Sequence, residues 1–125
     1  MAFLADNILD SGLSYLTANG DALYITSALS TTFAAATSTN ALGDKASISI
    51  GSPTDRTEAG NGRKVVVGAI SGGNVTGTGT ASHYAIVDTA NSAVLAAGAL
   101  TASQPVTSGN SFSVQAFDIG IPDAV

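Results

Sequence analysis

Apolar and polar positions follow two different patterns along this chain of 125 residues. In residues 6–18 the apolar side chains recur at a helical spacing, with Asp6 as the expected N-cap and Asn19 and Gly20 as the expected stop. After residue 20 the pattern changes to short alternating or β-branched runs, separated by Gly, Pro, Asn and Ser. The sequence therefore predicts an N-terminal helix followed by a body of strands.

The strands predicted from these runs cover residues 21–28, 45–50, 63–71, 74–80, 81–88, 92–100 and 111–118. A single helical turn is expected in residues 31–36, an exposed polar loop in 51–62 and a hairpin connection at 89–91. Short strands separated by frequent turns predict a mainly β fold, an antiparallel sandwich or barrel of about six or seven strands.

No linker divides the chain, so we expect a single domain over residues 1–125. Within it, residues 1–20 form an N-terminal arm or helix, 21–119 form the β body and 120–125 form a tail. Val, Ile, Leu and Phe contribute 30 of the 125 residues, which is enough for a thin aliphatic core.

The amino-acid composition excludes several classes of function but says little more about the fold. Ala, Gly, Ser and Thr fill 65 of 125 positions, and charged residues make up 10% of the chain, against roughly 25% in an average domain. A net charge of −5 with only four Lys and Arg argues against binding to nucleic acid. The absence of Cys excludes disulfides and thiol chemistry. The apolar runs fall short of the ~18 residues of a membrane span, and no secretory signal is expected.

Candidate catalytic residues are few. His83 is the single histidine, and its neighbour Ser82 is expected on the opposite face of the strand, with Asp88 five residues away. No Gly-x-Ser-x-Gly motif occurs, and no pair of ligands has a recognised metal-binding spacing. We therefore expect a structural His83, no enzymatic activity, no cofactor and no metal.

Two further features suggest contacts rather than chemistry. The glycine-rich run 72–80 lacks the Lys of a phosphate-binding loop, and Gly77 and Gly79 would leave one strand face bare for another backbone or subunit. Arg56, Arg63 and Lys64 cluster near the loop 51–62, where Asp55, Glu58 or an acidic neighbouring protein are the expected partners.

Several stretches carry a resemblance to known proteins: residues 36–45 (ATSTNALGDK), 61–65 (NGRKV), 70–88 (ISGGNVTGTGTASHYAIVD), 94–100, 106–112 and 117–119. On these motifs the chain resembles small virion structural proteins of tailed bacteriophages and prophages over residues 6–119. The most specific part is Gly-Thr-Ala-Ser-His-Tyr at 79–84, where the position of Tyr84 is often Trp in the proteins it resembles.

The resemblance implies a virion component, and we expect a capsid decoration (cement) protein. Such a protein binds the major capsid protein on the outer shell as a homo-oligomer, with a trimer favoured. It would lie on the virion surface, and in the host cytoplasm during assembly. Residues 1–9 would be its docking arm, and their deletion is expected to abolish capsid binding while the body stays folded. The candidate interface residues are Phe3, Leu4, Ile8, Leu9, Gly77 and Gly79.

Two alternatives remain open. A tail-fibre or receptor-binding module that recognises host surface sugars would use exposed aromatic side chains, for which Tyr24, Phe33 and Tyr84 are the candidates in a chain without Trp. A hydrolase would depend on His83 alone.

Overall fold

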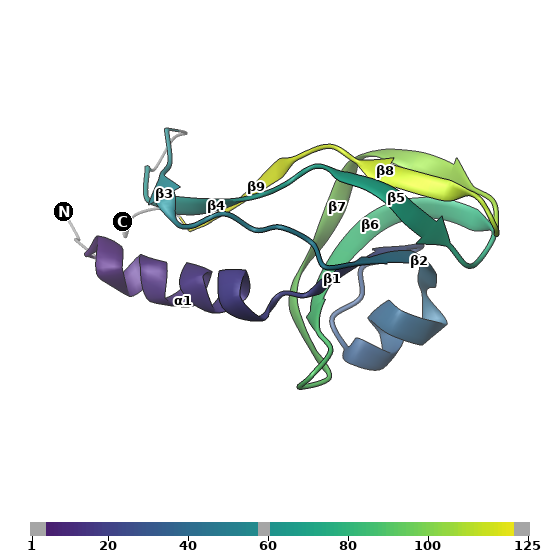
Figure 1. Cartoon of the computed structure of the whole chain (residues 1–125), viewed down its shortest axis with the longest axis horizontal. Helices are drawn as coiled ribbons and strands as arrows, with labels where there is room; N and C mark the ends of the chain where they lie inside the picture. The colour runs from purple at the N-terminus through teal and green to yellow at the C-terminus, as the bar shows by residue number, and fades with distance from the viewer. Residues whose placement is uncertain (1–4, 58–60, 122–125) are drawn as a thin grey trace. The chain divides into compact units, whose positions relative to one another are not determined.

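A computed structural model describes residues 5–57 and 61–121 (Figure 1). The chain forms two compact units, each assembled from segments distant in sequence. The helical unit comprises Met1–Asn19, Ser49–Ala69 and Gln115–Val125, and the sheet unit comprises Gly20–Ile48 and Ile70–Val114. The fold is mainly β with an N-terminal helix, as predicted, and all its paired strands are antiparallel.

The helical unit contains α1 (Asp6–Asn19) and a three-stranded sheet in the order β3 (Thr54–Asp55), β4 (Arg63–Val67) and β9 (Phe117–Ile121). The helix packs against β4, and its buried residues Leu9, Leu13 and Leu16 recur at helical spacing, as the pattern predicted. Asp6 is the first helical residue rather than the N-cap, because the Ala5 carbonyl already accepts from the N–H of Ile8 at 3.0 Å.

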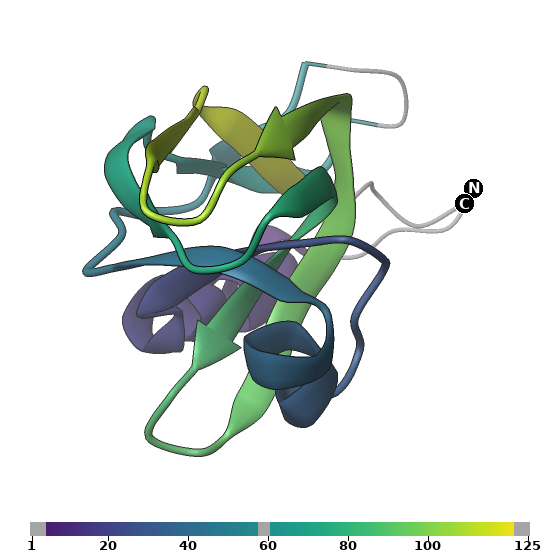
Figure 2. The same cartoon turned by 90° about the vertical axis from the view of Figure 1, so that its right-hand side faces the viewer.

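The sheet unit contains one six-stranded antiparallel sheet, which curls in Figure 2. Its spatial order is β7-β6-β1-β2-β5-β8. The bounds are β1 (Ala22–Thr26), β2 (Ala41–Ala46), β5 (Ile70–Val75), β6 (Gly79–Asp88), β7 (Ala93–Val106) and β8 (Ser111–Val114). A short π-helical segment, η1 (Ala35–Thr39), lies beside β1 and β2 and continues the helical turn expected at 31–36.

Both faces of the central strand β1 are buried. Leu23 and Ile25 occupy one face and are at most 2% exposed, as is Thr26 on the other face. Ala22 packs with Ala36 of η1 and with small residues of β6, so two layers of side chains sandwich this strand. Most of this strand is therefore internal, with Tyr24 half-buried, and Thr26 is accommodated because its hydroxyl donates to the Ala28 carbonyl at 2.8 Å.

Two glycines make room for the one buried aromatic ring of the sheet unit's described core. Phe112 of β8 is 6% exposed, and a Cβ placed on Gly73 would lie 2.4 Å from its ring. A Cβ on Gly43 of β2 would lie 3.2 Å from the same ring and 2.6 Å from a backbone oxygen. Because only glycine leaves this space, β2, β5 and β8 approach one another around Phe112.

The strand boundaries differ from the sequence prediction at several places. The strand expected at 74–80 does not form, because β5 ends at Val75 and β6 begins at Gly79, and the loop expected at 51–62 contains the short strand β3. The strand expected at 45–50 ends at Ala46, because Ser47 adopts a φ of +58° that turns the chain. The strand expected at 63–71 is divided between β4 and β5, which belong to different sheets. The strand expected at 111–118 is divided in the same way between β8 and β9. Both divisions coincide with the change from one unit to the other.

Candidate functional site

The distribution of charge along the chain defines the most unusual surface of the molecule. Thirteen residues carry a formal charge, and Asp88 is the only one of them between Val65 and Phe117. This stretch supplies β5, β6, β7 and β8 of the sheet unit. The remaining charges of that unit are Asp21, Asp44 and Lys45, which lie before or within β1 and β2.

Asp88 contributes no charge to the exposed surface. It is 3% exposed, and its carboxylate accepts hydrogen bonds from the backbone N–H groups of Ala90 and Asn91 and from the Asn91 side-chain amide. These contacts form the turn between β6 and β7, the hairpin predicted from the sequence. The surface contributed by β5–β8 is therefore free of exposed charge, which we call the neutral surface.

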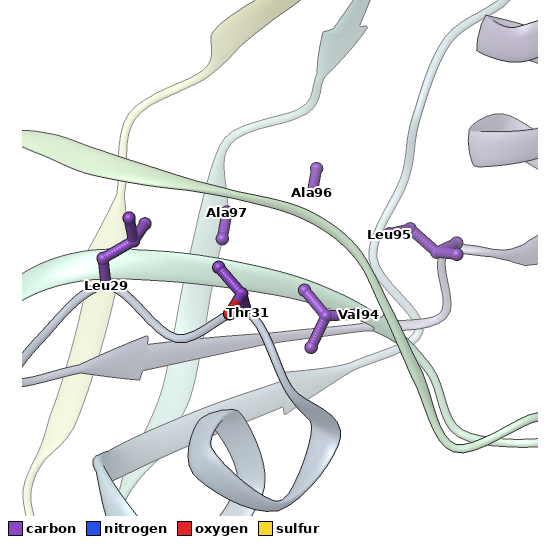
Figure 3. Close-up of a pocket in the computed structure, with 6 residues that line it drawn as sticks. All are labelled: Leu29, Thr31, Val94, Leu95, Ala96 and Ala97. Atoms are coloured by element: carbon purple, nitrogen blue, oxygen red, sulfur yellow. The ribbon is translucent and has the colours of Figure 1, made fainter.

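A shallow, open depression of about 270 Å³ lies on the neutral surface beside β7 (Figure 3). Four consecutive residues of β7 line one side, and Leu29 and Thr31 of the segment after β1 line the other. Leu29 is 55% exposed, which is unusual for a large apolar side chain. The β7 residues that line the depression are Val94, Leu95, Ala96 and Ala97.

The predicted arm residues are only partly described by the structure. Phe3 and Leu4 lie outside the described residues. Ile8 is 56% exposed on α1 and remains available to a partner, whereas Leu9 is 3% exposed and belongs to the core of the chain. Residues 6–9 form the start of α1, so deleting residues 1–9 would remove a buried leucine and the first helical turn. Because Leu9 is buried, we expect this deletion to destabilise the helical unit, so it is a poor test of a docking arm.

Gly77 and Gly79 do not leave a bare face. A Cβ on Gly79 would lie 3.2 Å from the Leu42 side chain, and one on Gly77 would lie 3.6 Å from Leu42 and from the Ala41 carbonyl. The space that the sequence suggested for another subunit is occupied by Leu42 of β2. A periodic pair of glycines indicates close approach, but it does not identify which segment approaches.

Ser82 and His83 come together despite the expectation of opposite faces. The pairing of β6 with β7 shifts register between Ala81 and His83, and this irregularity re-aims the side chains. Ser82 Oγ lies 2.7 Å from His83 Nδ1 and donates to the Ser27 carbonyl at 3.0 Å. The Ser82 hydroxyl has a single proton, and its contact with the Ser27 carbonyl competes with donation to the imidazole that a general base would need.

The residues paired with His83 add no catalytic group. His83 lies opposite Thr26 of β1 and Ala99 of β7, so neither partner offers a carboxylate to orient the ring. Within residues 5–57 and 61–121, no group of three His, Asp or Glu side chains is placed to hold a metal ion.

The basic residues near the loop 51–62 are engaged within the helical unit. Arg63 forms a two-pronged ion pair with Asp10 of α1, with Nε–Oδ1 at 2.8 Å, and contacts Asp55 at 2.6 Å. These hydrogen bonds, first to Asp10 and then to Asp55, raise the pKa of Arg63. Lys64 pairs with Asp118 at 3.0 Å. The predicted Asp55 partner is confirmed, and Asp10 was missed because it is 53 residues from Arg63 in sequence.

The aromatic residues considered for sugar binding are packed rather than displayed. Tyr24 and Phe33 pack on the cluster around Ala36. Tyr84 lies over Gly98, and burial raises its pKa. The aromatic side chain exposed most among the described residues is Tyr15 of α1, at 54%. The helical spacing that places Tyr15 away from the buried Leu9, Leu13 and Leu16 was the available signal.

Comparisons of the chain with protein-family models, curated proteins and solved structures found no match. In the described part of the chain, no helix has the length and apolar character needed to cross a bilayer.

Proposed function

We propose that this chain is a structural protein of a tailed-bacteriophage virion, which decorates the outer capsid shell. In this role it binds the major capsid protein and stabilises the contacts between capsomers. The resemblance of residues 6–119 to small phage virion proteins supports the proposal. The observation that carries it in the structure is the neutral surface, in which the single charged residue between Val65 and Phe117 is buried.

A neutral surface of small side chains suits a protein that is held in a lattice. Charged groups must lose water when they enter an interface, whereas Ala, Gly, Ser and Thr side chains lose little. Each contact with a capsid subunit is then modest in energy, and attachment becomes durable because many copies or many contacts act together. No charge is required for such a mechanism, in agreement with the composition of β5–β8.

A role without catalysis also fits the geometry at His83. Its ring is paired with a hydroxyl that donates to a backbone carbonyl, and the opposing residues Thr26 and Ala99 carry no carboxylate. The single histidine of the chain is thus engaged in a local contact with Ser82.

The copy number of the chain per virion tests the proposal. Quantitative mass spectrometry of purified virions is expected to give on the order of hundreds of copies, in proportion to the major capsid protein, since decoration follows the symmetry of the shell. About a dozen copies or fewer would contradict decoration and favour the tail or receptor-binding alternative.

The docking arm is tested by a shorter deletion than the sequence suggested. Removing residues 1–4 preserves α1, which begins at Asp6, and retains the buried Leu9. If residues 1–4 dock onto the shell, the truncated chain no longer co-sediments with capsids that lack it, while its circular dichroism is unchanged. Wild-type occupancy of the truncated chain would remove the arm from the proposal.

A further inference from the structure

The outer edge of β7 is a second feature of the neutral surface. β7 is the terminal strand of the six-stranded sheet, and no described residue pairs with its outer edge. Its pairing with β6 is irregular at Leu95 and again in residues 100–103, and it is regular from Ala96 to Ala99. These four residues therefore form a short, straight section of free strand edge.

This section lacks the usual protection of an edge strand. Natural sheets protect their edges with charged side chains, proline, bulges or a covering segment. Here the irregularities and Pro105 affect the flanks, while Ala96, Ala97, Gly98 and Ala99 combine free backbone groups with the smallest side chains. The apolar depression beside Val94–Ala97, with the exposed Leu29 on its far side, borders the same section.

The absence of charge allows a second copy of the acidic chain to approach this edge. The chain carries a net charge of −5, so two copies repel each other wherever their acidic surfaces face. All 29 residues from Thr89 to Phe117 are uncharged, so two copies that meet at β7 bring no like charges together. A strand of another protein that binds through charged side chains would meet no opposite charge at the β7 edge. The β7 edge of a second copy has the same uncharged, small side chains and therefore fits it.

We infer that two copies of this chain associate by antiparallel pairing of their β7 edges, which joins the two six-stranded sheets. Two identical strands that pair in this way are related by a two-fold axis perpendicular to the sheet. Directly opposed side chains must point to the same face of the sheet, and this holds only if the axis passes through one residue of the strand rather than between two residues. Centring the pair on Gly98 places Ala97 of one copy opposite Ala99 of the other. The second copy then also covers the depression that Leu29 borders.

This contact makes a prediction that differs from the resemblance. A two-fold contact gives a dimer, whereas the resemblance to phage virion proteins leads us to expect a trimer. The inference does not depend on capsid binding, because the pairing is a property of the isolated chain. Its failure would leave the proposed decoration role untouched, and failure of that role would leave the pairing untouched.

The experiment measures the mass of the full chain by sedimentation equilibrium over a wide concentration range. The wild-type chain is expected to move from the 12.2 kDa monomer to twice that mass as concentration rises. In the Ala99→Lys variant the two lysines lie diagonally, about 7–8 Å apart, on one face of the paired strands. We expect their repulsion to raise the dimer dissociation constant about two- to fivefold.

Matched variants separate pairing from general effects of the substitution. Ala46→Lys places the same charge at an exposed position of β2, an internal strand of the same sheet, and is expected to dimerise like the wild type. An equimolar mixture of Ala99→Lys and Ala99→Asp is expected to recover the dimer, because opposite charges then face each other. Hydrogen exchange of the wild type adds a readout without mutation, since amides in residues 96–99 should slow as concentration rises.

Four results of the sedimentation experiments would overturn the inference. These are a monomer at every concentration, a trimer that is indifferent to Ala99→Lys, equal loss of association in Ala46→Lys, and no recovery in the mixture. Concentration-independent exchange at residues 96–99 in a chain that does dimerise would place the contact elsewhere and would also overturn it.

Discussion

The two units of this protein differ most in how they use charge. The helical unit holds nine of the thirteen charged residues in 51 positions, whereas the sheet unit holds four in 74. In the helical unit the charges connect elements that are distant in sequence, as Arg63 of β4 does with Asp10 of α1. In the sheet unit the buried Asp88 serves its own hairpin turn, and Asp21 before β1 accepts two hydrogen bonds from Thr89 of the same turn.

The difference indicates two ways to stabilise a small unit. A helix on three short strands buries little surface, and directional ion pairs fix which face of α1 meets β4. A six-stranded antiparallel sheet obtains its order from backbone pairing and close side-chain contact, so it relies less on charge, and its strands β5–β8 leave their surface neutral. Perturbing each mechanism in turn tests whether the comparison holds.

The largest expected effect is loss of packing in the sheet unit. Phe112→Ala empties the space that Gly43 and Gly73 leave for the ring, and we expect a loss of about 3–5 kcal/mol in the free energy of unfolding. Urea denaturation followed by circular dichroism measures this loss. Because packing rather than charge is removed, the loss should be the same at low and high salt.

The neighbouring residue supplies the control. Ser113 lies next to Phe112 on the exposed face of β8, and Ser113→Ala should change stability by less than about 0.5 kcal/mol. A similar loss of unfolding free energy in both variants would mean that any substitution in β8 destabilises the sheet unit. Filling of the space beside Gly43 and Gly73 would then not be the cause.

An intermediate effect is expected from removing the central cation of the helical unit. Arg63→Met keeps an unbranched chain at this position but leaves Asp10 and Asp55 without their ion-pair partner. Hydrogen exchange should accelerate in α1 and β4 more than in β6 and β7. In the wild type, 1 M NaCl should accelerate exchange in α1 and β4 in the same direction, and Arg63→Met should lose most of this salt response.

Lys64→Met is the matched substitution one residue along the same strand. Lys64 pairs with Asp118, whose side chain is 40% exposed, so solvent already screens this pair and its removal should have a smaller effect. Equal acceleration in the two variants would contradict a specific role for the contact between Arg63 and Asp10.

Local patterns predicted the elements whose stabilising contacts are close in sequence. The helix was predicted from the spacing of Ile8, Leu9, Leu13 and Leu16, of which the three leucines are buried and Ile8 is exposed. The β6–β7 hairpin was predicted from its short connection. The breaks within 63–71 and 111–118 were missed because each run keeps a strand-like pattern of side chains while the chain passes from one sheet to the other. Nothing local in such a run marks a change of partner.

The candidate site depended on contacts between distant residues, which the sequence does not display. Gly77 and Gly79 suggested a free face, but Leu42 from β2 covers them. Ser82 and His83 were expected apart, but a register shift caused by the opposing strand brought them together. The absence of charge from residues 89–117 was visible in the sequence, but its meaning depended on the burial of Asp88 and on the edge position of β7.

The smallest expected effect is a loss of stability at alkaline pH that originates in the sheet unit. Tyr84 lies over Gly98, and burial raises its pKa above the ordinary value of 10.0. The unfolded chain therefore loses this proton first, so stability is complete below pH 10 and falls as pH rises through the interval up to the folded-state pKa. Tyr84→Phe removes the titrating group and should flatten this part of the pH profile. Tyr24 also has a raised pKa, through burial and then through Asp44, so some alkaline loss should remain in the variant. A profile unchanged by Tyr84→Phe would assign the alkaline loss to other groups and weaken the view that the sheet unit is held by packing of uncharged side chains.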